Sequence, residues 1–277
     1  MGDKIQILLA MVGYMAIVIL IGVYFAKKAQ ANSDSYFLGG RSLGPWVAAM
    51  SAEASDMSGW LLMGLPGVAY WCGIADAAWT AIGLALGTYI NWLLVSKRLR
   101  AYSVVSGDAI TVPDFLSNRF HEKKKVVLGI SAVFILIFFT VYAASCFVTC
   151  GKLFSGLFGL SYHSMMIAGA AFVLLYTILG GFLAESASDF MQSIVMIVAL
   201  VGVLGFGIFH AGGLGAVIEN AKSIPGYFSL TGMATPLTGE DGVQLVKDGS
   251  PLFGEAAGYS VLTILSTLSW GLGYFGM

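Results

Sequence analysis

Hydrophobic residues along this chain gather into seven long segments separated by shorter polar stretches. Each segment is long enough to cross the roughly 30 Å hydrocarbon core of a bilayer as a helix, which takes about 20 residues. The predicted spans are residues 5–26, 46–70, 75–96, 126–150, 162–184, 189–211 and 257–277. The pattern therefore predicts an all-α, polytopic helical membrane protein with a single transmembrane domain over residues 1–277.

The composition supports a membrane protein and excludes several other classes. The chain is 58% hydrophobic and 10% charged, whereas a soluble domain carries about 25% charged residues. Its net charge of −1 lacks the basic excess that nucleic-acid binding needs. Cys146 and Cys150, four apart in an apolar run, do not have the spacing of a metal site, and no nucleophile–base pair stands out. We therefore expect neither an enzyme nor a bound cofactor.

Basic residues are concentrated in two of the polar stretches, and this fixes an expected orientation. Residues 27–44 and 97–125 hold 10 of the 14 lysines and arginines. The positive-inside rule places such stretches in the cytoplasm. The N-terminus and the loop over residues 212–256 are then expected outside the cell membrane. Within the second basic stretch, residues 108–121 fit either a short amphipathic helix that starts at residues 111–113 or a plain connector.

Asp56 interrupts the second span with a carboxylate at membrane depth, where a charge costs roughly 2.5–3.5 kcal/mol. Ser55, Ser58 and Gly59 flank it, and such residues permit a helix to break and to free backbone carbonyls. Hard cations such as sodium prefer oxygen ligands of this kind. The stretch predicts an ion or small-solute site, and the alternative is a carboxylate held by neighbouring helices for structural reasons.

A second interruption lies in the seventh span, where Gly271, Gly273 and Gly276 weaken the helix. Trp270 and Tyr274 are four residues apart and share a face, so they can cover a small solute beside unwound backbone. The alternative is an aromatic belt at the membrane interface. Two broken helices that lie five spans apart match the repeat of an inverted-repeat transporter preceded by one extra helix.

Two further polar residues are candidates for a site. Tyr142 lies near the middle of the fourth span, which favours a cavity role over an interfacial one. Asp189 stands at the start of the predicted sixth span. There it can cap the helix N-terminus or serve an ion or a gate, and both possibilities stay open. Gly180 and Gly181 predict a close helix contact.

Several motifs, taken together, resemble the solute:sodium symporter family over essentially the whole chain, and most of all its bacterial proline-carrying members. They are the stretches 36–44 (YFLGGRSLG), 51–67 (SAEASDMSGWLLMGLPG), 82–92 (IGLALGTYINW), 138–142 (FFTVY), 176–184 (YTILGGFLA) and 270–276 (WGLGYFG). The resemblance implies a sodium-coupled uptake carrier with a leucine-transporter-type inverted-repeat core and one extra leading helix. Its ligands would be Na⁺, as the only metal, and L-proline or a similar small solute.

The resemblance also implies roles for particular residues. The backbone carbonyls of Ala54 and Met57 would bind sodium, and Asp56 would be essential for sodium coupling. The residues that would form or adjoin the proline pocket are Ser58, Gly59, Tyr142, Trp270 and Tyr274. Arg41 and Asp189 would act in coupling or gating.

The chain departs from the family pattern in two respects. It has Ala187-Ser188-Asp189 where the family usually has Trp-Thr-Asp. It also ends inside the seventh predicted span, so we expect only the first repeat and the start of the second. The leading hypothesis is sodium-coupled symport of L-proline into the cell. The alternatives are a carrier for another small solute, a transporter-like sensor, and an inactive truncated fragment.

Overall fold

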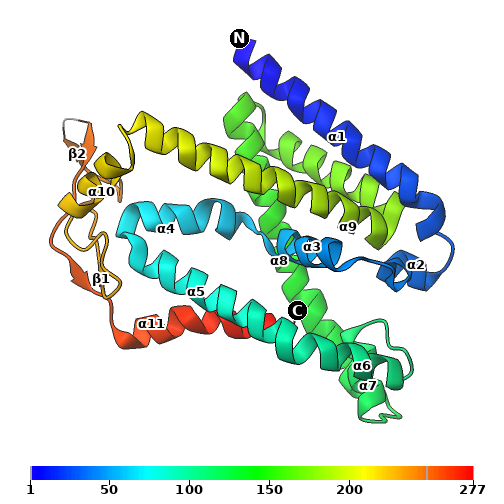
Figure 1. Ribbon diagram of the computed structural model, residues 1–277. Coiled ribbons are helices and arrows are strands. Elements are labelled where there is room, and N and C mark those ends of the chain that lie inside the picture. The colour runs from blue at the N-terminus through cyan, green and yellow to red at the C-terminus, as the bar shows by residue number, and fades with distance from the viewer. Residues whose placement is uncertain (1, 248, 277) are drawn as a thin grey trace. The chain divides into compact units, whose positions relative to one another are not determined.

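The computed structural model describes residues 2–247 and 249–276. For residues 2–4, 62 and 274–276 it describes the backbone alone. Helices make up most of the described chain (Figure 1). The chain forms two compact units, one of residues 1–59 and 103–199, the other of residues 60–102 and 200–277.

All the secondary-structure elements described in the first unit are helices. Its elements are α1 (Gly2–Ala29), α2 (Ser33–Leu38), the 3₁₀ turn η1 (Gly39–Arg41), α3 (Pro45–Asp56), α7 (Val112–Arg119), α8 (Val126–Phe158) and α9 (Tyr162–His210) as far as Ala199. The short helix expected within residues 108–121 is α7. Thr111 caps it by accepting a hydrogen bond from the Asp114 amide at 3.2 Å, and Pro113 occupies its first turn.

A kink at Gly181 divides α9, which is otherwise helical over 49 residues. Gly181 has φ 54° and ψ −155°, a conformation that only glycine adopts readily. A Cβ there would lie 2.8 Å from the Tyr36 carbonyl oxygen, and a Cβ on Gly180 would lie 3.0 Å from the Gly22 Cα. The close contact predicted for this glycine pair is confirmed. The boundary between the predicted spans 162–184 and 189–211 was wrong, because the helix changes direction at Gly181 and continues without a loop.

The second unit combines helices with a mostly irregular segment that contains short strands. Its helical elements are the π-turn η2 (Trp60–Gly64), α4 (Leu65–Cys72), α5 (Ile74–Ile90), the π-turn η3 (Asn91–Ser96), α6 (Lys97–Val105) as far as Tyr102, α10 (Leu214–Ser223), α11 (Val261–Leu268) and the 3₁₀ stretch η4 (Ser269–Gly276). The strand β1 (Gly232–Met233) pairs antiparallel with β4 (Ala257–Gly258), and β2 (Val246–Lys247) pairs with β3 (Ser250–Pro251).

Glycines bring α5 against α11 and η4. A Cβ on Gly83 would lie 2.5 Å from the carbonyl oxygen of Leu268, and a Cβ on Gly87 would overlap the backbone of Gly271. Small residues permit this close approach of helices in a membrane. The seventh predicted span is therefore packed on the third, backbone against backbone.

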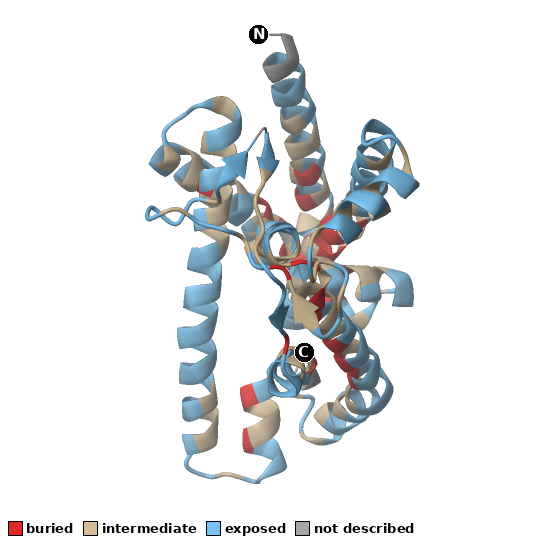
Figure 2. Cartoon of the chain, turned by 90° about the vertical axis from the view of Figure 1, so that its left-hand side faces the viewer, coloured by how far each residue is buried: buried red, intermediate tan, exposed pale blue. Residues whose placement is uncertain are grey.

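Many large apolar side chains of the long helices are exposed. Figure 2 shows exposed residues along most of the length of the long helices. In the described residues, four helices are long and apolar enough to cross a membrane: Ile5–Ala29, Ile74–Val105, Val126–Phe158 and Tyr162–His210. At 1.5 Å per residue, α9 is long enough to cross a hydrocarbon core about 30 Å thick twice. Exposure on this scale is typical of helices solvated by lipid, and the chain is a multi-pass membrane protein.

Candidate functional site

The helix break predicted in the second span is present. Helix α3 ends at Asp56, and Met57 has an extended backbone with φ −64° and ψ 108°. Helical structure returns just before η2 and α4. The last carbonyls of a helix lack partners within it, and the helix dipole makes this end attractive to cations. This end of α3, where Ala54 and Asp56 lie, is therefore the negative end of the helix dipole.

Tyr142 of α8 lies beside this break. Its hydroxyl donates a hydrogen bond to the backbone oxygen of Ser55 at 3.2 Å. The hydroxyl of Tyr142 therefore lies at the last turn of α3, and its cavity role stays a prediction. The bond also occupies one of the carbonyl oxygens that the end of α3 leaves without a helical partner.

Thr149, two turns further along α8, lies against the break at Gly59. A Cβ added to Gly59 would overlap the Thr149 hydroxyl and lie 3.1 Å from the Thr149 Cβ. The Thr149 hydroxyl itself donates to the Ser145 carbonyl oxygen at 3.0 Å. Glycine at position 59 is thus required by the close approach of α8. The sequence analysis did not identify Thr149, because the residues next to it in the sequence do not indicate a contact with Gly59.

Asp189 is buried inside the first unit, with 7% of its surface exposed. Its Oδ2 accepts hydrogen bonds from the hydroxyls of Ser51 at 2.9 Å and Ser55 at 3.0 Å. The residue lies within the helical part of α9 that follows the kink, so the helix-capping interpretation was wrong. Ser51 and Ser55 are four residues apart on one face of α3, which is the spacing that lets both reach one carboxylate.

Other small polar residues surround this carboxylate on α9. Ser193 donates its hydroxyl to the Met50 carbonyl oxygen at 2.9 Å, or to that of Asp189 at the same distance. Ser186 is fully buried, and its Oγ has no hydrogen-bond partner in the part of the chain that the structure describes. The α3–α9 contact therefore has a polar interior of hydroxyl and carboxylate oxygens.

The second unit holds the other broken helix. The rings of Trp60 and Trp270 meet edge to face, with centroids 5.4 Å apart and an interplanar angle of 83°. Trp60 follows directly after Gly59, and Trp270 is the second residue of η4. Trp60 and Trp270 therefore contact each other within the second unit. The unwinding predicted for the seventh span takes the form of a 3₁₀ helix, which is wound more tightly than an α-helix. The side chain of Tyr274 lies outside the part of the chain that the structure describes.

Arg41 forms an ion pair with Asp108 in the first unit. Both residues have a left-handed backbone, with φ 54° for Arg41 and 56° for Asp108. Such a conformation is uncommon for residues other than glycine and costs on the order of 1–3 kcal/mol. The pair joins η1, which precedes α3, to the turn that precedes α7. Arg41 is thus anchored to this turn through its guanidinium group.

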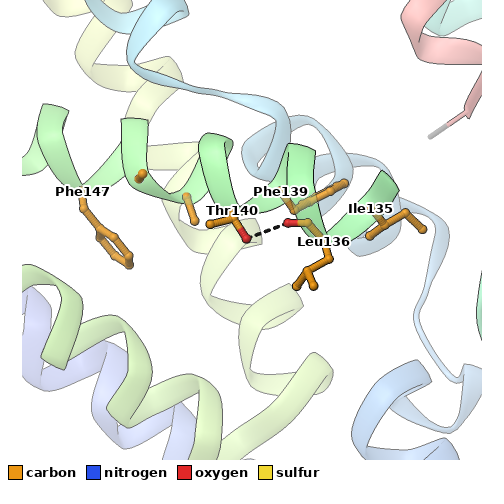
Figure 3. A pocket seen from close by; sticks show the side chains of 7 residues that line it. Ile135, Leu136, Phe139, Thr140 and Phe147 are labelled. Atoms are coloured by element: carbon orange, nitrogen blue, oxygen red, sulfur yellow. Dashed lines mark hydrogen bonds between the residues drawn. The ribbon is translucent and has the colours of Figure 1, made fainter. Parts of the chain in front are cut away.

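An apolar depression of about 540 Å³ lies along α8 (Figure 3). All its lining residues belong to this one helix, and the only hydroxyl among them, on Thr140, donates to the Leu136 carbonyl oxygen at 2.6 Å. A binding site for a charged amino acid needs convergent polar groups. The depression offers none that is free, so it is not a suitable site for such a solute.

The sequence is similar to those of known proteins. The model of the "Sodium:solute symporter family" matches residues 36–277. Proteins named "Sodium/proline symporter" from Staphylococcus aureus strains JH9, USA300 and COL are each 44% identical to this chain over 263 residues. The match covers 95% of this chain and 46% of each relative, so the chain spans about half the length of the relatives that it matches.

Proposed function

This chain belongs to the sodium:solute symporter family, and we propose that it acts in the sodium-coupled uptake of L-proline across the cell membrane. The helix break at Met57, with Tyr142 bonded to Ser55 beside it, is the observation that carries the proposal. The choice of proline follows the names of the relatives that are 44% identical. A coupling ion other than Na⁺ and an enzymatic activity have no support from the family.

The proposed sodium ligands lie at the end of α3. The backbone oxygens of Ala54 and Met57 and the carboxylate of Asp56 supply hard oxygen donors in a short stretch. The negative end of the α3 dipole adds to the attraction for a cation. The negative charge of Asp56 also offsets the cost of placing a cation at membrane depth.

The proposed solute pocket follows directly along the chain. Ser58 and Gly59 supply backbone at the break, and Tyr142 supplies a ring and a hydroxyl. Trp270 and Tyr274 are assigned to the solute pocket from the family resemblance alone, and the rings of Trp270 and Trp60 contact each other. Sodium bound at the same break would hold the backbone of Ser58 and Gly59 in the shape that the solute needs.

Coupling between sites is proposed to pass through Ser55 and Asp189. Ser55 accepts a bond from Tyr142 with its backbone oxygen and donates one to Asp189 with its side chain. A change at the break therefore reaches both α8 and α9. Arg41, anchored to Asp108, is proposed to hold the start of α3 during this change.

The architecture that we propose is one transmembrane domain over residues 1–277, of the leucine-transporter type, with α1 as the extra leading helix. The seven predicted spans then correspond to α1, α3–α4, α5, α8, the two parts of α9, and α11 with η4. The N-terminus would lie outside the cell and the basic stretches inside.

Uptake of labelled proline tests the proposal. Cells that lack their own proline carriers would produce the protein, and accumulation would be measured in sodium medium and in choline medium. We expect accumulation only with sodium, and unlabelled proline should compete better than other amino acids. Equal uptake in choline medium would overturn the sodium coupling, and better competition by a different solute would overturn the choice of proline.

A further inference from the structure

The base of the loop between α10 and α11 is bound to the turn between α4 and α5. We call this base the strap, and it consists of residues 227–234 and 257–259, which the pairing of β1 with β4 joins. The Ile74 amide donates to the Tyr227 carbonyl oxygen at 2.9 Å, and the Ala234 amide donates to the Cys72 carbonyl oxygen at 2.9 Å. The strap therefore lies against this turn, inside the second unit.

The turn between α4 and α5 admits the strap at close range. Gly73, at the turn, has φ 82°, and a Cβ there would lie 2.5 Å from the Tyr227 carbonyl oxygen. Trp79 of α5 donates its indole N–H to the Leu230 carbonyl oxygen at 2.8 Å. Ala234 is fully buried. The strap is thus fixed to the start of α5 at several points of its backbone.

Asp76 and Tyr259 close the strap onto α5 at the point where α11 begins. The Tyr259 hydroxyl donates to Asp76 Oδ2 at 2.9 Å, and Tyr259 is buried. The next residue, Ser260, caps α11 by accepting a hydrogen bond from the Thr263 amide at 3.1 Å. Hydrogen bonds that a carboxylate accepts are among the stronger ones in proteins. The Asp76–Tyr259 bond, which we call the clasp, therefore links α5 to the start of α11.

The clasp and Trp270 are held by the same two elements, α5 and the α11–η4 segment. The close approach of Gly87 to Gly271 fixes the residue after Trp270 against α5. The Tyr259 hydroxyl oxygen also lies 3.5 Å from Thr267 Oγ1, three residues before Trp270. A shift of Tyr259 relative to α5 therefore reaches Trp270 through α11.

We propose that Asp76 and Tyr259 are positioning residues, whose bond holds α11 and η4 in the arrangement in which Trp270 meets the solute. The inference rests on the proposed function, because Trp270 belongs to the proposed solute pocket. Neither Asp76 nor Tyr259 is assigned to that pocket. Without the clasp, the backbone bonds of the strap still attach the loop to α5. The clasp therefore sets how tightly the solute is bound, while the fold of the carrier is kept.

The kinetics of sodium-dependent proline uptake test this role in Tyr259→Phe, which removes the bond and keeps the ring. We expect KM for proline to rise about threefold to tenfold, the usual net effect of one lost hydrogen bond, with the maximal rate per carrier molecule unchanged. A merely structural role would lower the amount of carrier and leave KM as it is. Tyr89→Phe, at an exposed tyrosine of α5, is the matched control and should keep the parent values.

Asp76→Ala removes the same bond from the other side and gives a second measurement if Tyr259→Phe does not fold. Because both changes break one bond, the double variant Asp76→Ala/Tyr259→Phe should have a KM no higher than the single variants. Asp76→Asn keeps an acceptor oxygen, and its KM should stay close to that of the parent. An unchanged KM in the folded single variants, or additive increases in the double variant, would overturn the proposal.

Hydrogen–deuterium exchange of the purified proteins separates the clasp from the proposed function, because it does not depend on transport. We expect the strap amides, including those of Ala234 and Tyr259, to exchange faster in Tyr259→Phe and at the parent rate in Tyr89→Phe. Unchanged exchange in Tyr259→Phe would overturn the clasp, and faster exchange with an unchanged KM would overturn the positioning of Trp270. Faster exchange in a protein whose parent takes up no proline would support the clasp and overturn the proposed function.

Discussion

Ser55 connects three helices through its two oxygen atoms. Its backbone oxygen accepts from Tyr142 of α8 at 3.2 Å, and its hydroxyl donates to Asp189 of α9 at 3.0 Å. The residue itself lies in the last turn of α3, one position before Asp56. The shape of the break is therefore held from two sides, and removing either bond should change it.

Tyr142→Phe removes the bond from α8 while keeping the ring. A net hydrogen bond is worth about 1 kcal/mol, so we expect KM for proline to rise about fivefold. Tyr24→Phe, at an exposed tyrosine of α1, is the matched control and should leave KM unchanged. An unchanged KM in Tyr142→Phe would show that the hydroxyl does not support the pocket.

Gly59→Ala tests the close approach of Thr149. The added Cβ would overlap the Thr149 side chain, and overpacking of this kind costs about 1–3 kcal/mol. We expect uptake to fall strongly, and the second change Thr149→Ala to restore part of it, because it removes two of the three crowded atoms. Gly129→Ala on α8, where nothing lies within 4 Å, should have no effect. A double variant no better than Gly59→Ala alone would contradict the contact.

At the scale of elements, the sequence predicts features with local causes better than features that depend on distant contacts. The break after Asp56 follows from the weak helix propensity of the nearby serines and glycine, and the start of α7 follows from capping by Thr111. Both the break and the helix start are present. Polar residues 185–189 indicated the end of one span and the start of another. They are instead helical, and Ser186 and Ser188 are fully buried. Burial of this kind depends on distant partners that the local pattern does not show.

The kink of α9 provides a stability prediction. Gly181→Ala puts a side chain at φ 54° and ψ −155° and 2.8 Å from the Tyr36 oxygen. We expect a destabilisation of about 1–3 kcal/mol or more, visible as a lower melting temperature in detergent. Gly202→Ala, in the same helix with nothing within 4 Å, should be neutral or stabilising. Equal melting temperatures for the two variants would contradict a kink that requires glycine.

At the scale of the whole molecule, the distribution of charge predicts the orientation in the membrane. In a protein whose Cys72, Cys146 and Cys150 are replaced by serine, Lys124→Cys and Lys222→Cys would each introduce a single cysteine. The two positions are expected on opposite sides of the membrane. We expect a membrane-impermeant maleimide to label Lys222→Cys on intact cells, and Lys124→Cys only after the membrane is opened. The reverse pattern would overturn the proposed orientation.

The sodium dependence of proline uptake in Asp56→Asn tests most directly whether the break after Asp56 binds the coupling ion. Loss of a charged ligand should raise the sodium concentration for half-maximal uptake about tenfold or more, which corresponds to about 1.4 kcal/mol. Asp34→Asn, at an exposed carboxylate in the first turn of α2, should keep the parent value. If Asp56→Asn needs the same sodium concentration as the parent, the break after Asp56 does not bind the coupling ion through this carboxylate.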